Sequence, residues 1–379
     1  MGQISDRGTM ARLHDYVSLS RQRANEGQLP LWRQMAEMLG LLVLTGNGPG
    51  LYHIAGFWRR EIEWADKLAQ LGHFAYRRRL RSLNSPGFVK LAQNKLVEKG
   101  LMTLVGVPTP TFLGFLHTVK GRAADGRELR TADDLVHLIE SCALERFCVK
   151  RVQGWAGRNF DIVEVVRDAG RLRLHLSGAG RTVDVEEFIE MRRVVGGKVG
   201  SIIEDYLVQH PQMAAFNPSS VNTYRIWVRE GRDGRGHARL AYLRLGRAGA
   251  IVDNQSAGGI VAPVNMDTGM ISAALDGLPE RRTFPCHPDH GAPIAGQPAP
   301  MWQESRRLAA SVLELFPGLR FAGVDVAVST AGPVILELNP SPDRIGAAFV
   351  DVPSKWALAE PTVTGKGLHG VPPNLPAHS

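Results

Sequence analysis

The sequence lacks the features of several protein classes. Its 379 residues include only three cysteines, Cys142, Cys148 and Cys286, and none belongs to a C-x-x-C pair. This excludes a disulfide framework and argues against a zinc site. The longest apolar stretch, Leu39 to Leu44, is far shorter than the roughly 18 residues of a membrane-spanning helix. The opening MGQISDRG has no apolar run behind a basic start, so we expect no secretory signal and a cytoplasmic location.

Lysine is also scarce. Nine of the 45 basic residues are lysines and 36 are arginines, and with 37 acidic residues the net charge is +8. One basic cluster is dense, and its members are Arg77, Arg78, Arg79 and Arg81. Its simplest interpretation is a solvated helix face; the alternatives are sites for an anionic substrate, a nucleic-acid backbone or anionic lipid. Because no aromatic residues interleave with it, we expect no specific nucleic-acid partner.

The composition that is present is that of a globular protein of two or three domains, with 44% hydrophobic and 22% charged residues. Apolar spacing of three to four residues predicts helices at 13–24, 31–44, 57–83, 88–105, 131–144, 185–191 and 302–315. Alternating or continuous apolar runs predict strands at 112–116, 147–152, 160–167, 171–176, 201–209, 224–229, 238–245, 260–264, 322–328 and 333–338. The sequence therefore predicts a mixed helix-and-strand fold.

A hairpin near the end of the chain carries the clearest chemistry. Asp325 lies in its first strand, Glu337 in its second, and Asn339 two residues further on, so Glu337 and Asn339 share a face. A tight hairpin can bring Asp325 opposite them, and two carboxylates with one amide oxygen suit Mg²⁺. The alternative is a pair of solvent-facing acids. Apolar neighbours argue against it, because a buried carboxylate needs a counter-charge.

Lys150 lies in the apolar strand 147–152, just before a small glycine turn. Gly154 and Gly157 permit the backbone to approach a phosphate closely, and Arg158 adds positive charge. A lone strand lysine is as often a surface residue, and the chain has no P-loop motif, so this pattern alone is weak. The later segment 201–209 either is an ordinary edge strand or hydrogen-bonds an adenine edge.

Taken in this order, a strand lysine, a glycine turn, E-x-[YF]-[LIV] and D…E-x-N resemble the ATP-grasp superfamily, over roughly two-thirds of the chain from Lys95 to Pro340. The segment 220–228 (SVNTYRIWV) resembles the family strand whose arginine faces the γ-phosphate. The segment 254–259 (NQSAGG) is similar to part of the ribosomal glutamate ligase and its relatives. The nearest group is the sugar-transfer-associated or α-L-glutamate-ligase-related ATP-grasp proteins.

The resemblance implies an α+β ATP-grasp fold, with two α+β lobes clasping ATP behind a helical N-terminal region. The implied regions are 1–90, helical; 91–220, small lobe and hinge; 221–348, large lobe with the metal site; and 349–379, a flexible C-terminal tail. The implied cofactors are ATP and Mg²⁺. The lid has only two glycines, and Gln209 or His210 stands where relatives have a ribose-binding acid.

The resemblance also implies a role for each matching residue. Those implied to bind ATP are Lys95, Lys150, Gly154, Gly157, Arg158, Glu204, Tyr206, Leu207 and His210. Within this set Lys150 holds the α- and β-phosphates, the segment 154–158 is a phosphate lid, and Glu204 meets the adenine amino group.

The remaining matches concern the reacting groups. The resemblance implies that Arg225 stabilises the transferring phosphate, that Asn254 lies beside the reacting centre, and that Asp325, Glu337 and Asn339 bind Mg²⁺. The expected activity is that of an ATP-dependent carboxylate–amine ligase acting through an acyl phosphate. It would add an amino acid such as glutamate during modification of a cell-surface polysaccharide or peptide. The alternatives are a kinase that phosphorylates a sugar or polymer hydroxyl, and a non-catalytic nucleotide- or nucleic-acid-binding protein.

Overall fold

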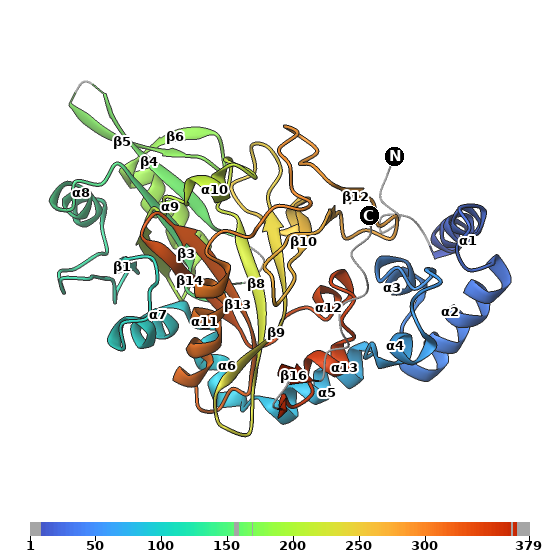
Figure 1. Ribbon diagram of the computed structural model, residues 1–379. Helices are drawn as coiled ribbons and strands as arrows, with labels where there is room; N and C mark the ends of the chain where they lie inside the picture. The colour runs from blue at the N-terminus through green and yellow to red at the C-terminus, as the bar shows by residue number, and fades with distance from the viewer. Residues whose placement is uncertain (1–8, 155–158, 169, 365–366, 370–379) are drawn as a thin grey trace.

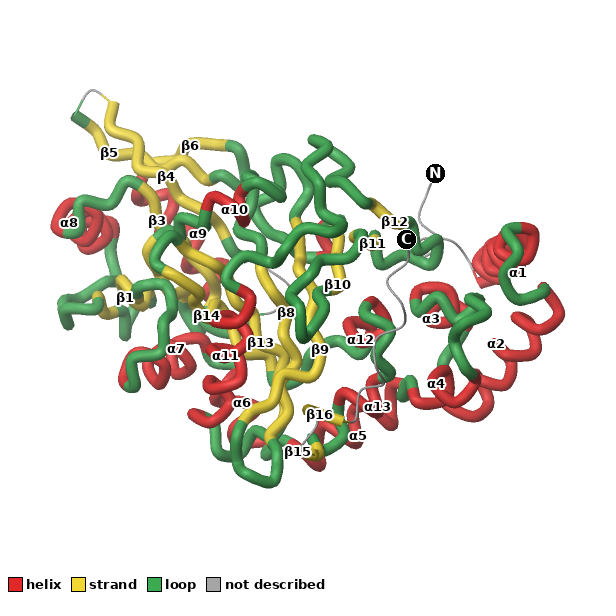
Figure 2. Tube along the Cα trace, viewed as in Figure 1, coloured by secondary structure: helices red, strands yellow, loops and turns green. Residues whose placement is uncertain are grey.

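Two β-sheets and a group of N-terminal helices make up the protein. The computed structural model describes residues 9–154, 159–168, 170–364 and 367–369. The N-terminal helices lie at one end of the molecule, the first sheet lies at the other end, and the second sheet lies between them (Figure 1). Figure 2 shows that strands gather in these two sheets while helices and long loops cover them. None of the helices in the described ranges combines the length and hydrophobicity needed to cross a membrane.

Four helices form the N-terminal end: α1 (Thr9–Asn25), α2 (Leu31–Thr45), α3 (Pro49–Ile54) and α4 (Trp64–Ala69). They enclose their own apolar cluster, which includes Met38, Leu41 and Tyr52. A buried ion pair lies within it, with the Lys67 ammonium 2.6 Å from the Glu37 carboxylate. The Tyr52 hydroxyl donates to the same carboxylate, so the buried charge is fully paired.

The first sheet has the strand order β2-β1-β7-β3-β4-β5-β6. Its strands are β1 (Phe112–Leu116), β2 (Arg122–Ala123), β3 (Arg146–Arg151), β4 (Asp161–Asp168), β5 (Arg171–Leu176), β6 (Arg181–Asp184) and β7 (Ser201–Asp205). Helices α8 (Ala132–Ser141) and α9 (Val185–Gly196) pack on one face, where Leu135, Leu138 and Phe188 are buried. The other face is left to line a cavity.

The second sheet has the strand order β12-β11-β10-β9-β8-β13-β14. Its strands are β8 (Thr223–Glu230), β9 (Gly236–Leu245), β10 (Ile260–Pro263), β11 (Ala274–Leu275), β12 (Thr283–Phe284), β13 (Phe321–Ser329) and β14 (Gly332–Asn339). Short helix α10 (Pro211–Ala214) links the two sheets in sequence, and α11 (Trp302–Val312) packs against the second. A two-stranded ribbon, β15 (Thr362–Thr364) and β16 (Gly367–His369), stands apart from both sheets.

Helix α5 (His73–Leu83) anchors the N-terminal region to the second sheet. Its Tyr76 hydroxyl donates to the Pro342 carbonyl at 2.9 Å. Asn84, which follows the helix, donates through Nδ2 to the carbonyls of Phe321 and Pro340 at 2.8 Å each. These bonds hold α5 beside the end of β14, so the helix is placed to form a wall of the same cavity.

Two predicted helices are broken, for local reasons. The predicted helix 57–83 is two helices, α4 and α5, because the backbone at Glu63 and Gly72 is extended. A Cβ at Gly72 would lie 1.7 Å from the Thr45 carbonyl oxygen, so the chain passes too close to α2 for any side chain. The predicted helix 88–105 is α6 (Pro86–Ala92) and α7 (Lys95–Leu104), because the Asn94 side chain caps α7 by accepting from two backbone amides.

The predicted C-terminal tail is packed at its beginning. Helices α12 (Ile345–Phe349) and α13 (Ser354–Ala357) lie against the second sheet and α5. Phe349, Ala357 and Leu358 are buried there, so residues 349–358 belong to the folded body. The prediction of a flexible tail from residue 349 is therefore wrong for this segment, because burial of its apolar side chains stabilises it against the folded body.

His53 makes the N-terminal helices sensitive to acid. It is fully buried beside the Ser20 hydroxyl, and burial, aided by Arg23, lowers its pKa from 6.5 to about 4. The unfolded chain therefore binds more protons than the folded chain between these two values, so stability is lost as pH falls from 6.5 to 4. We expect a loss on the order of 3 kcal/mol at most, at 1.36 kcal/mol per pKa unit. Urea unfolding of wild type and His53→Gln at pH 7 and pH 4 checks this; equal acid sensitivity of the two proteins would contradict it.

Candidate active site

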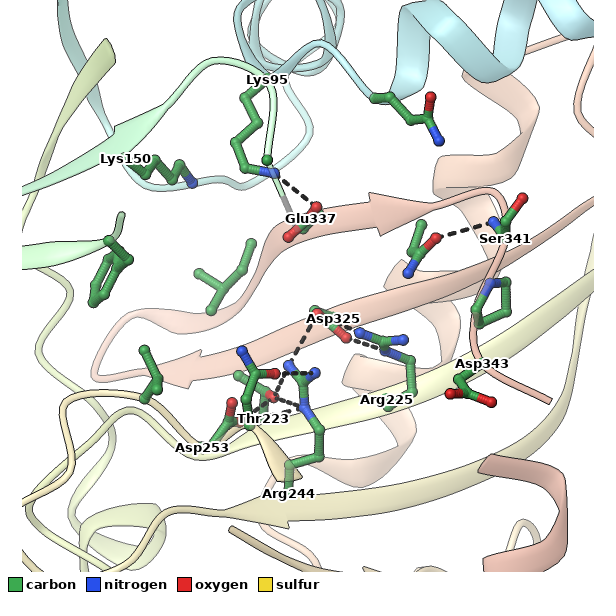
Figure 3. Close-up of a pocket in the computed structure, with 18 of the residues that line it drawn as sticks. Lys95, Lys150, Thr223, Arg225, Arg244, Asp253, Asp325, Glu337, Ser341 and Asp343 are labelled. Carbon is green, nitrogen blue, oxygen red and sulfur yellow. Dashed lines mark hydrogen bonds and ion pairs between the residues drawn. The ribbon is translucent and has the colours of Figure 1, made fainter. Parts of the chain in front are cut away.

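A cavity of about 1060 Å³ lies between the two sheets. Residues of β3, β7 and the start of α7 line one side, and residues of β8, β9, β13 and β14 line the other. Helices α5 and α6 close one end, and the loop 251–255 also lines it. Figure 3 shows that Lys95 and Lys150 approach it from one side and Arg225, Arg244, Asp325 and Glu337 from the other.

One row of residues crosses four strands of the second sheet. The strand register pairs Tyr242 with Arg225, Arg225 with Asp325, and Asp325 with Glu337. Paired positions on neighbouring strands share a face, so these four side chains form a polar stripe on the cavity side. The residues between them, such as Tyr224, Ile226 and Val324, point into the opposite core and are fully buried.

Asp325 is the centre of this stripe. Its carboxylate accepts two hydrogen bonds from the Arg225 guanidinium and one from Arg244 Nη2, the latter at 2.9 Å. Burial would raise the pKa of Asp325, but the two arginines outweigh it and hold that pKa below its usual range. The carboxylate is therefore ionised in the folded protein.

Arg244 links Asp325 to the loop that follows β9. Its guanidinium donates to the Thr223 hydroxyl at 2.8 and 3.0 Å and to Asn254 Oδ1 at 3.3 Å. The Thr223 hydroxyl in turn donates to Asp253, whose pKa is raised by burial. Asn254 thus lies at the cavity edge, where Arg244 orients its amide.

Glu337 and Asn339 continue the stripe along β14. The Lys95 ammonium lies 2.7 Å from Glu337 Oε1, and the Glu337 side chain is 37% exposed. Asn339 Oδ1 accepts from the Ser341 amide at 2.9 Å. Asp325, Glu337 and Asn339 all line the cavity, so the predicted metal residues offer hard oxygen donors from one face. Both Asp325 oxygens accept from arginines and Asn339 Oδ1 accepts from the Ser341 amide, so Glu337 Oε2 is the oxygen of this set that is free of described partners and fits a Mg²⁺ ion that keeps phosphate and water ligands.

On the first sheet, one carboxylate is shared by two lysines. Glu204 on β7 lies 2.7 Å from the Lys150 ammonium and 3.2 Å from that of Lys99 on α7. Burial lowers the pKa of Lys99 to about 8, although the negative charge of Glu204 acts to raise it. For Lys150, the attraction of Glu204 outweighs burial and raises its pKa, so Lys150 keeps its charge where it borders the cavity.

Glu98, next to Lys99 on α7, is fully buried. Its Oε1 accepts from the Leu338 amide, which ties α7 to β14. Burial, together with the charge of Glu337, raises the pKa of Glu98 to about 8. Helix α7 therefore joins the Glu337 side of the cavity to the Glu204 side through three adjacent polar contacts.

The predicted nucleotide-binding residues are partly assembled. Gly154, Glu204, Tyr206 and Leu207 line the cavity. His210 is not among its lining residues; its ring nitrogen instead accepts from the Gln212 amide and caps α10. The predicted lid residues Gly157 and Arg158 lie outside the described residues.

A family model described as sugar-transfer associated ATP-grasp matches residues 76–361. The chain belongs to this family. The match begins within α5 and includes both sheets and every described residue of the polar stripe. The fold is accordingly an α+β ATP-grasp fold with a helical N-terminal region, and the cofactors of such enzymes are ATP and Mg²⁺.

Several solved structures are similar to this ATP-grasp protein at low identity. An ADP complex of N5-carboxyaminoimidazole ribonucleotide synthetase is 10% identical, with a TM-score of 0.37, covering 70% of this chain and 52% of that one. Biotin carboxylase from Campylobacter jejuni is 12% identical, with a TM-score of 0.44 and coverages of 76% and 50%. The ATP-grasp ligase PsnB is 17% identical, with a TM-score of 0.35 and coverages of 73% and 62%.

This ATP-grasp chain thus spans only about half to two-thirds of the length of the solved proteins it resembles. No curated protein matches it in sequence.

Sequence reasoning left out two central residues. Arg244 lies in an apolar strand two positions after Tyr242. Residues two apart in a strand share a face, which was a signal that both face the cavity. Lys99 is one helical turn from Lys95, but nothing local separates a buried lysine from a solvated one. Both are held by partners far away in sequence, Asp325 and Glu204.

Proposed function

We propose that this ATP-grasp protein is an ATP- and Mg-dependent carboxylate–amine ligase. A substrate carboxylate attacks the γ-phosphate of ATP to form an acyl phosphate, and an amine then displaces phosphate to form an amide. The proposal is supported above all by the polar stripe Tyr242–Arg225–Asp325–Glu337, which faces Lys95 and Lys150 across one cavity. Such a site positions phosphates and neutralises charge without a protein nucleophile.

Each group has a task in this proposal. Lys150, oriented by Glu204, holds the α- and β-phosphates, with Lys95 beside it. The backbone at Tyr206 and Leu207 contacts adenine. Glu204 is ion-paired with Lys150 through Oε2 and with Lys99 through Oε1, and its Oε1 accepts no hydrogen bond from a described residue, so this buried oxygen remains available to the adenine amino group.

The reacting end has its own set of residues. Glu337 and Asn339, together with Asp325, which also neutralises Arg225 and Arg244, would hold Mg²⁺, and the ion would supply charge neutralisation at the phosphates. The guanidinium of Arg225, kept in place by Asp325, faces the transferring phosphoryl group. Asn254, oriented by Arg244, lies beside the reacting carbonyl.

The proposed acceptor is a component of a cell-surface polysaccharide or peptide, and the proposed added group is an amino acid such as glutamate. We place the reaction in the cytosol, where ATP is available; the three unpaired cysteines agree with that compartment.

The test is an ADP-release screen over amino acids, sugars and peptides, followed by product mass. A ligase gives a product whose mass is the sum of the two substrate masses less the mass of one water. A product that is one hydroxyl substrate plus a phosphoryl group would replace the ligase by a kinase. Failure of every pair to release ADP, by a protein that binds ATP, would count against both activities.

Lys150→Ala tests the nucleotide site separately. The change removes a charge-assisted phosphate contact worth about 1.5–3 kcal/mol, so Mg·ATP affinity should fall by roughly one to two decades. Glu204 keeps Lys99 as a partner, so the fold should survive. Calorimetric titration with ATP measures the change, and Lys120→Ala, an exposed lysine of the same lobe, is the control. Wild-type affinity in a folded Lys150→Ala protein would leave Lys150 with only a structural role.

A further inference from the structure

Helix α5 presents a basic stripe to one end of the cavity. The residues of α5 and the following turn that line it are His73, Tyr76, Arg77, Leu80, Arg81 and Asn84. Their spacing of three and four residues is that of one helix face. Arg78 and Arg79 belong to the same arginine cluster but do not line the cavity. All four arginines are exposed to solvent, and the fold divides them into a pair that lines the open end of the cavity, Arg77 and Arg81 (the inward pair), and a pair that does not (the outward pair).

Within the part of the chain that the structure describes, the inward pair has no acidic ion-pair partner. Among the described residues, Arg77, Arg81 and Lys90, the lysine of α6 on the same wall, form no ion pair. This contrasts with Lys95, Lys150, Arg225 and Arg244, each of which has a carboxylate within 3 Å. The acid on this wall is Asp343, which accepts from the Ile345 amide. This end of the cavity therefore carries an excess of positive charge.

The basic stripe of α5 lies next to the proposed metal ligands and away from the proposed adenine contacts. The Tyr76 and Asn84 hydrogen bonds fix α5 against Pro340 and Pro342, immediately after the proposed metal ligand Asn339. The proposed adenine contacts, Tyr206 and Leu207, line the cavity just after strand β7 of the first sheet. A cavity of about 1060 Å³ is at the upper end of the range for small-ligand sites, so it has room for a second substrate beside a nucleotide.

We propose that Arg77 and Arg81 bind a phosphate group of the second substrate, so that this substrate is a phosphorylated small molecule. The proposal rests on the proposed function, in which ATP occupies the rest of the cavity. Two guanidinium groups one turn apart hold several oxygens at once, which suits a phosphate. Together with Lys90 they offer more positive charge than a single carboxylate requires.

The test uses the full chain saturated with Mg²⁺ and the non-hydrolysable analogue AMP-PNP, so the γ-phosphate site is filled and no turnover is needed. Inorganic phosphate is the probe, titrated by phosphorus NMR line broadening. We expect the dissociation constant to rise at least tenfold in Arg77→Gln/Arg81→Gln. The matched control, Arg78→Gln/Arg79→Gln, removes the same charge from the same helix and should bind phosphate as wild type does.

Three results would overturn the proposal. One is equal phosphate binding by the two double variants, because only the net charge of the helix would then matter. Another is a loss of AMP-PNP affinity in Arg77→Gln/Arg81→Gln, because the two arginines would then bind the nucleotide rather than the second substrate. The third is acetate binding as tight as phosphate, which would indicate a carboxylate substrate. None depends on the product of the reaction, so the proposed function can fail independently in its own mass assay.

Discussion

Glu337→Gln is expected to lower kcat by about 10²–10³-fold, the loss typical when one preorganised charged contact to a transition state is removed. Gln keeps the shape of the side chain but removes the negative charge that would hold Mg²⁺. Lys95 contacts Oε1 of Glu337, and no described residue bonds to Oε2, so that oxygen faces the cavity for a cation. Single-turnover ADP release at rising Mg²⁺ measures the effect.

The fold of this variant should be intact. The Glu337 side chain is 37% exposed, and the charge that raises the pKa of Glu98 is removed, which relieves a repulsion. The buried Lys95 loses its counter-charge but can still donate to the amide oxygen of Gln, as it does to Glu337 Oε1. Glu230→Gln is the control, because Glu230 lies in the same sheet and pairs with Arg320 at 3.1 Å outside the cavity. Normal turnover of Glu337→Gln at ordinary Mg²⁺ would remove Glu337 from the metal site.

Asp325→Asn is expected to cost about 3–5 kcal/mol of folding stability, because it leaves two guanidinium groups beside a buried neutral amide. Asp325 is only 5% exposed and is held by Arg225 and Arg244 together. Urea unfolding followed by tryptophan fluorescence should report the loss, since Trp227 is buried in the adjacent strand β8.

Asp184→Asn provides the comparison for a surface pair. Asp184 lies 2.9 Å from Arg173 with a side chain that is 66% exposed, so its loss should cost no more than about 1 kcal/mol. If Asp325→Asn were no more destabilising than Asp184→Asn, then the Asp325 carboxylate would not be the structural centre of the stripe.

The sequence by itself determined which faces of the strands carry chemistry. Alternation placed Glu337 and Asn339 on one face, and a tight hairpin was expected to bring Asp325 opposite them. The order of a strand lysine, a glycine turn, E-x-[YF]-[LIV] and D…E-x-N predicted the superfamily, which the family match confirms. These signals are local, because a period of two residues in a strand is written into neighbouring positions.

Only the tertiary structure decided which partner each charge has. Strand β13 lies between β8 and β14, so Asp325 meets Arg225, 100 positions earlier, and Arg244 as well. The sharing of Glu204 by Lys99 and Lys150, and the division of the Arg77–Arg81 cluster into inward and outward pairs, depend in the same way on how helices dock on sheets. Periodicity specifies the face of an element, but the neighbour of that face is set by the packing of segments far apart in the chain.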